Sequence, residues 1–204
     1  MAQKIPRFKY MVYVLNIIEP APEGATTVNT TSRSPEPWSK ALSPFYLGPV
    51  PLYGSYMSQT VENGYQYSKI YKEYVNFNGD PTPSYFEWAQ AGWAKVRADR
   101  YPMGKGAKPE YAYWDGQKLK YIEARKKIYM PLYLMAVART SAYKRLKELY
   151  LKGDIYLRDF DGYNHRKLGM TYEEVINNPK KTMGHAFILA MMLELGKDLQ
   201  KLLL

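Results

Sequence analysis

Two neighbouring stretches decide the fold of this chain: LSPFYLGP at residues 42–49 and TVENGYQYSK at residues 60–69. The first leads into residues 45–56, which carry two Gly and two Pro and predict short strands or an extended loop around a turn. In the second, apolar residues recur at roughly helical spacing as far as residue 74, which predicts a helix over residues 60–74. The chain therefore changes from extended backbone to helix between the two stretches.

Before these stretches the sequence predicts strands. Residues 9–18 are rich in β-branched and aromatic side chains and predict a first strand. A turn at residues 21–24 leads to a second short strand over residues 26–31. Residues 34–38, with two prolines, predict a loop.

After residue 80 the sequence predicts helices. A capping box formed by Ser84 and Glu87 predicts a helix that runs to about residue 100. A second capping box is formed by Thr171 and Glu174. Further helices are expected over residues 115–139, with a kink or a division at Pro131, over residues 141–151 and over residues 183–203.

The fold class predicted from these elements is α+β. We expect a single, mainly α-helical domain over residues 1–204 around a small β-sheet. Residues 1–18 lack a cleavage site, and no apolar run is long enough to span a bilayer. We therefore expect a cytoplasmic protein without a membrane partner, and the sequence makes no prediction of oligomeric state.

The composition excludes several kinds of chemistry. The chain has 204 residues, no Cys and two His, so disulfides, thiolate metal sites and a Cys nucleophile are excluded. His165 and His185 are interpreted as structural, with an acid–base role for one of them left open. We expect no metal and no cofactor, and carboxylates become the best candidates for catalysis. Tyr is abundant, with 21 copies against 6 Phe.

The excess positive charge is confined to one segment. The formal net charge is +10, and residues 93–152 hold 15 Lys and Arg against 5 Asp and Glu, whereas the segments on either side are each neutral. Such a segment attracts polyanions, and aromatic residues interleave with its charges. It predicts a phosphate-bearing partner, either nucleic acid or a nucleotide, while a solvated helix face is the alternative.

Glu62, Gln66 and Lys69 form a stripe at helical spacing near the start of the predicted helix. Glu62 and Gln66 are four residues apart and therefore share a face. A Glu, Gln and Lys stripe that faces a pocket would be a plausible reacting set. The alternative is a stripe that faces only solvent.

The quoted stretches resemble the signature of the NADAR (YbiA-like) family. There L-S-N-F-Y-x-x-P is followed by L-x-G and then by P-T-V-E-H-Y-x-Q-x-x-K. The resemblance covers roughly residues 29–195, with a basic elaborated segment at about 80–115. The further matching segments are Lys120–Arg125 with Met130, Lys147–Asp161 and Met183–Met192.

The resemblance implies a YbiA-like fold and N-glycosidase activity. Members of the family cleave ADP-ribose from guanine bases or act on phosphoribosylamino-pyrimidines. Such a bond breaks through an oxocarbenium-like sugar, which a carboxylate can stabilise while an acid or a cation helps the base to depart. On this basis we assign catalytic roles to Glu62, Asp161 and Lys69.

The remaining candidate residues are polar, aromatic or basic. Asp159 is an alternative second carboxylate, and an Asx turn before Gly162 is the structural interpretation of Asp159 and Asp161. The candidate substrate-binding residues, each of which has a loop or core role as its alternative, are Asn29, Arg33, Ser43, Phe45, Tyr46, Gln66, Trp114, Asp159 and Tyr163. The candidate nucleic-acid-binding residues are Arg125, Lys126 and Lys127.

Three functions follow as hypotheses. The first is an ADP-ribosyl glycohydrolase that removes ADP-ribose from guanine in nucleic acid, with the basic segment binding the polymer. The second is an N-glycosidase for phosphoribosylamino-pyrimidine intermediates of riboflavin biosynthesis. The third is a non-catalytic domain that binds ADP-ribose or nucleic acid. It stays open because Pro44 replaces the Asn of the family pattern and because the family's Trp-Gly near the acidic turn is not plainly present.

Overall fold

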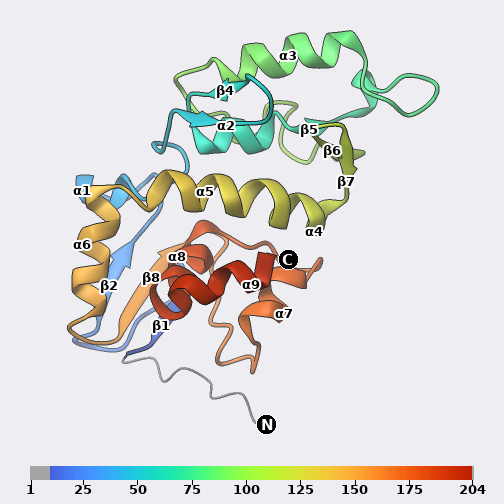
Figure 1. Cartoon of the computed structure of the whole chain (residues 1–204). Helices are drawn as coiled ribbons and strands as arrows, with labels where there is room; N and C mark the ends of the chain where they lie inside the picture. Colours follow the sequence, from blue (N-terminus) through green and yellow to red (C-terminus); the bar gives the residue numbers. More distant parts are fainter. Residues whose placement is uncertain (1–9, 204) are drawn as a thin grey trace. The chain divides into compact units, whose positions relative to one another are not determined.

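The computed structural model describes residues 10–203, which form two compact units (Figure 1). Unit 1 consists of the described residues in Met1–Leu42 and Arg139–Leu204, and unit 2 is Ser43–Ala138. Both contain helices and short strands, so the expectation of a mixed α+β fold is confirmed. The single domain over residues 1–204 stays a prediction. Lys9, where the first strand was expected to begin, and Leu204 lie outside the described residues.

Unit 1 is built on a parallel sheet of three strands. β1 (Val12–Asn16) and β2 (Thr26–Asn29) both pair in parallel with β8 (Ile155–Asp159), so that the order is β1-β8-β2. The sequence predicts β1 and β2 but assigns no strand to residues 155–159. Those residues alternate between buried and partly exposed positions, as expected for a strand with one face on a core.

The helices of unit 1 follow the prediction in most places. α6 (Ser141–Tyr150) and α8 (His185–Leu195) lie where helices were expected, and α8 contacts β1 and β8. Two predictions were wrong in detail. A short helix α1 (Pro37–Lys40) begins inside the predicted loop. The expected helix over 183–203 is divided at Gly196, whose φ of 53° ends α8 before η3 (Gly196–Leu199) and α9 (Gln200–Leu203).

The capping box predicted at Thr171 is confirmed. The Thr171 hydroxyl accepts a hydrogen bond from the Glu174 amide at 3.2 Å. The Glu174 carboxylate accepts one from the Thr171 amide at 2.7 Å. These two bonds satisfy the first amides of α7 (Tyr172–Asn177).

Unit 2 alternates short strands with helices. β3 (Val50–Pro51) and β4 (Met57–Ser58) form an antiparallel pair around a turn, as expected. A second antiparallel sheet has the order β5-β6-β7. Its strands are Lys69–Ile70, Tyr111–Trp114 and Gln117–Leu119. The helical elements are α2 (Val61–Gln66), η1 (Lys72–Tyr74), α3 (Pro83–Trp93), α4 (Tyr121–Ala124), η2 (Arg125–Tyr129) and α5 (Met130–Val137).

The helix predicted over residues 60–74 was too long. Thr60 caps its start by accepting from the Asn63 amide at 3.0 Å. The helix ends at Gln66, and just beyond it the Ser68 hydroxyl donates to the Tyr65 carbonyl at 2.7 Å. The next residues then pair with β6 as strand β5.

The capping box at Ser84 and Glu87 was also wrong. α3 begins two residues earlier than the box predicts, at Pro83, and its N-cap is Thr82, whose side chain makes no capping hydrogen bond. Proline favours this first helical position because its missing N–H has no partner there in any case. The helix ends at Trp93, short of residue 100.

Asp115 does not begin a helix. Asp115 and Gly116 have φ angles of 46° and 80° and form the turn between β6 and β7. An Asp-Gly pair favours this left-handed hairpin turn. The expected helix starts only at Tyr121. Before Pro131 the backbone widens into the π-helical turn η2, in which the Met130 amide donates to the Arg125 carbonyl five residues back.

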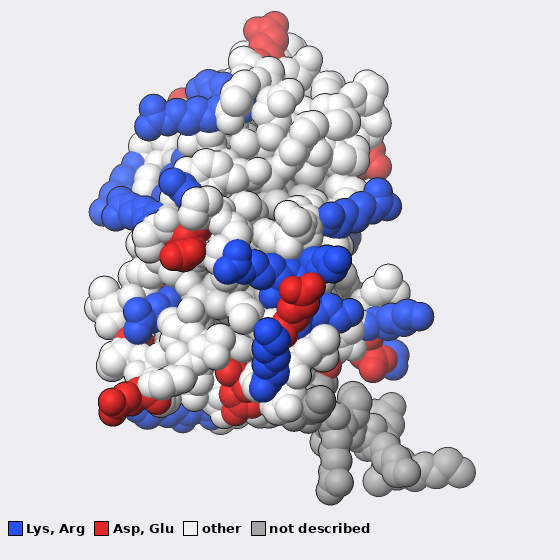
Figure 2. All heavy atoms as spheres, turned by 90° about the vertical axis from the view of Figure 1, so that its left-hand side faces the viewer, with Lys and Arg blue, Asp and Glu red and all other residues white. Residues whose placement is uncertain are grey.

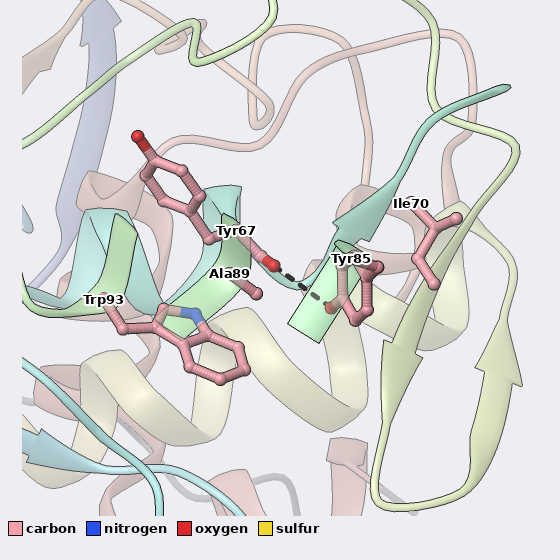
Figure 3. Packing of buried hydrophobic residues seen from close by; sticks show 5 residues of the cluster. All are labelled: Tyr67, Ile70, Tyr85, Ala89 and Trp93. Carbon is pink, nitrogen blue, oxygen red and sulfur yellow. Dashed lines mark hydrogen bonds between the residues drawn. The ribbon is translucent and has the colours of Figure 1, made fainter. Parts of the chain in front are cut away.

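An aromatic cluster forms the core of unit 2 and accounts for much of the tyrosine (Figure 3). Its buried members are Tyr67, Ile70, Tyr85, Ala89 and Trp93. The Tyr85 hydroxyl donates to the Tyr67 carbonyl at 3.1 Å, which satisfies a buried donor. The ring of Tyr67 lies directly against the backbone of α3, where a Cβ at position 92 would overlap the ring. The cluster therefore requires glycine at this position.

This close approach predicts the effect of Gly92→Ala. Alanine in a helix interior is favoured over glycine by up to about 1 kcal/mol, whereas overpacking a core costs roughly 1–3 kcal/mol. Because the added methyl meets the rigid ring of Tyr67, we expect net destabilisation of about 1–2 kcal/mol in urea unfolding. Gln90→Ala, at an exposed position of the same helix, should change stability by less than about 0.5 kcal/mol. Equal effects of the two substitutions would contradict the packing argument.

Candidate functional site

A chain of hydrogen bonds links the three residues of the predicted stripe in unit 2. The Gln66 amide nitrogen donates to the Glu62 Oε1 at 2.9 Å. The Lys69 ammonium donates to the Gln66 Oε1 at 2.7 Å. The structure therefore brings Glu62, Gln66 and Lys69 together, as the sequence predicts.

The backbone that brings these three hydrogen-bonded side chains together differs from the predicted helix. Glu62 and Gln66 occupy successive turns of α2, but Lys69 lies on β5. The tight turn at residues 67–68 brings the Lys69 side chain back to Gln66. The ammonium also lies 4.6 Å from the centroid of the Tyr65 ring, in a cation–π contact. A helix that continued to residue 74 would have moved Lys69 a further turn away from Glu62.

Lys69 opens onto a pocket within unit 2. The pocket has a volume of about 180 Å³. Aromatic and basic side chains line it together with the chain segments around β6. The lining residues are Tyr65, Lys69, Pro109, Glu110, Tyr111, Ala112, Leu119, Lys120, Tyr121 and Ala124. Glu62 is buried and is not among the lining residues. It is linked to the pocket by the hydrogen bonds through Gln66 to Lys69.

The surroundings of Lys69 change its proton affinity. Burial lowers the pKa of Lys69 to about 8, although the nearby Glu62 carboxylate acts in the opposite direction. Burial also raises the pKa of Tyr65. At neutral pH Lys69 is therefore still a cation, but it releases its proton far more readily than a solvated lysine.

Arg125, which the sequence analysis predicted to bind nucleic acid, is buried and not on the surface. Only 2% of the residue is exposed. Its guanidinium donates to the Tyr121 hydroxyl at 2.8 Å and lies 4.7 Å from the centroid of the Tyr121 ring. The basic run at residues 125–127 lies in the π-helical turn η2, of which Arg125 is a buried residue. Burial there removes it from any contact with a polymer backbone.

The two neighbouring lysines remain near the surface. Lys126 is partly exposed, and Lys127 is exposed and donates to the Gln117 side chain at 2.9 Å. Other basic residues of the segment, among them Lys105 and Lys108, are exposed. On the face drawn in Figure 2, Lys and Arg side chains stand at the surface with Asp and Glu side chains between several of them. That face shows no uninterrupted basic surface.

The other predicted residues of unit 2 lie outside the lining of this pocket. Ser43 is buried, and the Phe45 amide donates to its hydroxyl at 3.4 Å. Tyr46 is exposed. Trp114 packs edge to face on Tyr53, with ring centroids 5.0 Å apart. None of the four is among the residues that line the pocket.

Unit 1 gathers a second set of predicted residues where its strands end. Asp159, at the end of β8, is buried and does not face solvent. Its Oδ2 lies 3.1 Å from the His185 Nδ1 and accepts from the Ala186 amide at 3.1 Å. The His185 Nε2 lies 2.7 Å from the Thr30 carbonyl oxygen. Asp159 therefore caps α8 and ties it to β8, and the interpretation of this aspartate as substrate-binding is replaced by a structural one.

The other candidates of unit 1 make contacts of their own. Asn29 is used locally, because its side-chain oxygen accepts from the amide and the hydroxyl of Thr31 at 3.0 and 2.8 Å. The exposed Arg33 lies 5.4 Å from the centroid of the Phe160 ring. Asp161 is partly exposed. The Tyr163 ring packs on Phe187 at 4.7 Å, and the Lys181 ammonium lies 4.7 Å from its centroid.

The predicted residues thus fall into two sets, one in each unit. Glu62, Gln66 and Lys69 are brought together in unit 2, while Asp159 and Asp161 lie in unit 1. Sequence reasoning missed Tyr65 and Tyr121, which line the pocket, and the contact of His185 with Asp159. The spacing of four residues between Tyr121 and Arg125 was the available signal for their contact.

Comparison with known proteins places the chain in a family. Residues 14–189 match DUF6939, a family of unknown function, and the chain therefore belongs to it. No curated protein matches the chain. Within residues 10–203, no helix is long and apolar enough to cross a membrane. The same residues contain no cluster of three or more His, Asp or Glu that could hold a metal ion.

The buried ammonium predicts a pH-dependent reactivity. We expect Lys69 to titrate near pH 8, and Glu62→Gln to lower this value further because the carboxylate stabilises the charged form. Competitive labelling with acetic anhydride across pH 6–11, read by mass spectrometry, measures it. Lys95, whose pKa is raised by its hydrogen bonds to Asp99 and Tyr67, serves as the internal control. Titration of Lys69 above 10 would contradict the described burial.

The capping carboxylate of unit 1 predicts a loss of stability. Leaving a buried polar group without its hydrogen-bond partner typically costs about 1–3 kcal/mol, and more where a charged group is involved. We therefore expect Asp159→Asn to lower the free energy of unfolding by about 3 kcal/mol in urea titrations. Asp198→Asn removes the exposed partner of Lys201 and should cost less than about 1 kcal/mol. Similar losses in both variants would show that Asp159 does not tie α8 to β8.

Proposed function

We propose that this member of the DUF6939 family is an N-glycosidase that hydrolyses the bond between a ribose and a nucleobase. The observation that carries the proposal is the chain from Glu62 through Gln66 to Lys69, which ends in a pocket. The resemblance to the NADAR signature at the same residues supports it. A lysine with a pKa of about 8 is a suitable proton donor near neutral pH.

In the proposed reaction the C–N bond between the ribose and the base breaks while water adds to the anomeric carbon. Lys69 donates its proton to the departing base. A proton from the attacking water is released, so that the products are the free sugar and the neutral base. Glu62 and Gln66 hold the ammonium in place and keep it charged, which makes Glu62 a positioning residue for Lys69. Glu110 supplies a carboxylate at the pocket lining.

Two substrate classes remain within the proposal. The basic segment favours guanine bases of nucleic acid that carry ADP-ribose. The pocket of about 180 Å³ favours a smaller ligand, because pockets for drug-sized ligands typically measure about 300–1,000 Å³. The burial of Arg125 also removes one of the cations expected to bind a polymer. These two observations support phosphoribosylamino-pyrimidines as the second candidate substrate.

Hydrolysis assays test the proposal with both substrates. Loss of a general acid typically lowers rates by about 10²–10⁴-fold, so Lys69→Met should lower kcat/KM for the accepted substrate by at least about 100-fold. Activity should fall as pH rises through about 8, because the proton donor is lost. Glu62→Gln should move this fall to lower pH.

Glu87→Gln provides the matched control, since Glu87 is an exposed carboxylate on α3 of the same unit. It should leave both the rate and the pH profile unchanged. Release of no sugar from either substrate by the intact protein would overturn the proposed function. Full activity of Lys69→Met would overturn the role of Lys69.

A further inference from the structure

Three tyrosines from three different elements line the pocket. Tyr65 comes from α2, Tyr111 from β6 and Tyr121 from α4. Aromatic rings that line a pocket provide flat surfaces on which nucleobases stack. The three rings differ in what already covers them.

Two of the rings are engaged by lysines and are mostly buried. The Lys69 ammonium lies 4.6 Å from the centroid of Tyr65, whose ring also packs on Tyr129 at 5.0 Å. The Lys118 ammonium lies 5.6 Å from the centroid of Tyr111, whose hydroxyl donates to the Gly79 carbonyl at 2.8 Å. These contacts fix Tyr65 and Tyr111 as walls of the pocket.

Tyr121 is the most exposed of the three. Some 46% of the residue is accessible to solvent, whereas Tyr65 and Tyr111 are only partly exposed. The buried Arg125 holds it from behind, with its guanidinium against one face of the ring and a hydrogen bond of 2.8 Å to the hydroxyl. The ring is therefore oriented before any ligand binds, which reduces the entropy cost of binding.

The pocket also offers positive charge beside this ring. Lys120, next to Tyr121 in the chain, is exposed and lines the pocket. A phosphate or a phosphorylated sugar is the anionic group that lysines bind as point charges. An aromatic surface next to the Lys120 ammonium suits a ligand with a flat base at one end and a phosphate at the other, and it leaves Lys69 for the base as proposed above.

We infer that Tyr121 is the stacking surface for the base of a nucleoside monophosphate unit, oriented by the buried Arg125. This inference rests on the proposed function for the identity of the site. It adds that the base and the phosphate are the groups that the site recognises. Tyr121 is a binding residue, and Arg125 is a positioning residue that acts through it.

Equilibrium binding of two probes tests the inference with the full chain. The probes are guanosine 5′-monophosphate and ribose 5-phosphate, which share the sugar and the phosphate but differ in the base. The expected result is that the nucleotide binds at least about tenfold more tightly than the sugar phosphate, because stacking of one base contributes a factor of this order or more. Calorimetry at fixed low salt measures both affinities.

Two substitutions locate the effect. Tyr121→Leu should weaken binding of the nucleotide by about tenfold or more and leave binding of ribose 5-phosphate unchanged. Tyr101→Leu is the matched control, because Tyr101 is 50% exposed in the same unit, has the Arg100 guanidinium 5.5 Å from its ring centroid and does not line the pocket. It should change neither affinity.

Equal weakening of both probes by Tyr121→Leu, equal affinity of the intact protein for both probes, or no binding of the nucleotide would each overturn the inference. Arg125→Met should weaken nucleotide binding but not sugar phosphate binding, and loss of both would show that Arg125 only supports the fold. These measurements do not depend on turnover. Base-dependent binding without any hydrolysis would therefore refute the proposed function and leave the stacking role of Tyr121 intact.

Discussion

Burying a charge costs several kcal/mol unless a partner compensates it, and this constraint shapes both units. In unit 1 the Asp159 carboxylate meets the start of α8 and His185. The Glu194 carboxylate, in the same helix, is held by Arg166 at 2.7 Å and by the Tyr172 hydroxyl at 2.8 Å, and it accepts from the Val12 amide at 2.6 Å. These contacts attach the start of α8 to β8 and its last turn to β1.

Unit 2 meets the same constraint differently. Glu62 lies on α2 and Lys69 on β5, and Gln66 joins them by using both ends of its amide. An amide can donate and accept at the same time, which neither charged partner can do. The arrangement leaves a cation at the lining of a pocket with an anion behind it. That order of charges, rather than the presence of any one residue, is what the proposed chemistry uses.

The sequence predicted those features that depend on local pattern. The first two strands, helix α6, the capping box at Thr171 and the grouping of Glu62, Gln66 and Lys69 all follow from spacing within a few residues. The strand at 155–159 was missed because its partners lie far away in sequence. The helix predicted from residue 115 starts only at Tyr121, because Asp115 and Gly116 form a left-handed hairpin turn.

The fate of Arg125 shows why site residues are harder to predict than elements. Three consecutive basic residues look alike in a sequence, yet the first is buried and the third is exposed. Successive residues of a helix point about 100° apart, so only one of the three can face the interior of unit 2. The charge pattern alone does not tell which one it is, and that choice decides which cation supports the pocket and which faces water.

The order of strands in unit 1 has a consequence for the synthesis of the protein. β1 and β2 emerge from the ribosome early, but both pair with β8, which follows only after the whole of unit 2 has been made. Sheet formation between such distant segments is slow, because a long loop must close before any pairing is gained. Unit 2 is continuous in sequence and needs no later segment for its own strands. The newborn chain therefore carries two unpaired strands while its middle part folds, and this interval is when it is most exposed to aggregation and has most to gain from a chaperone.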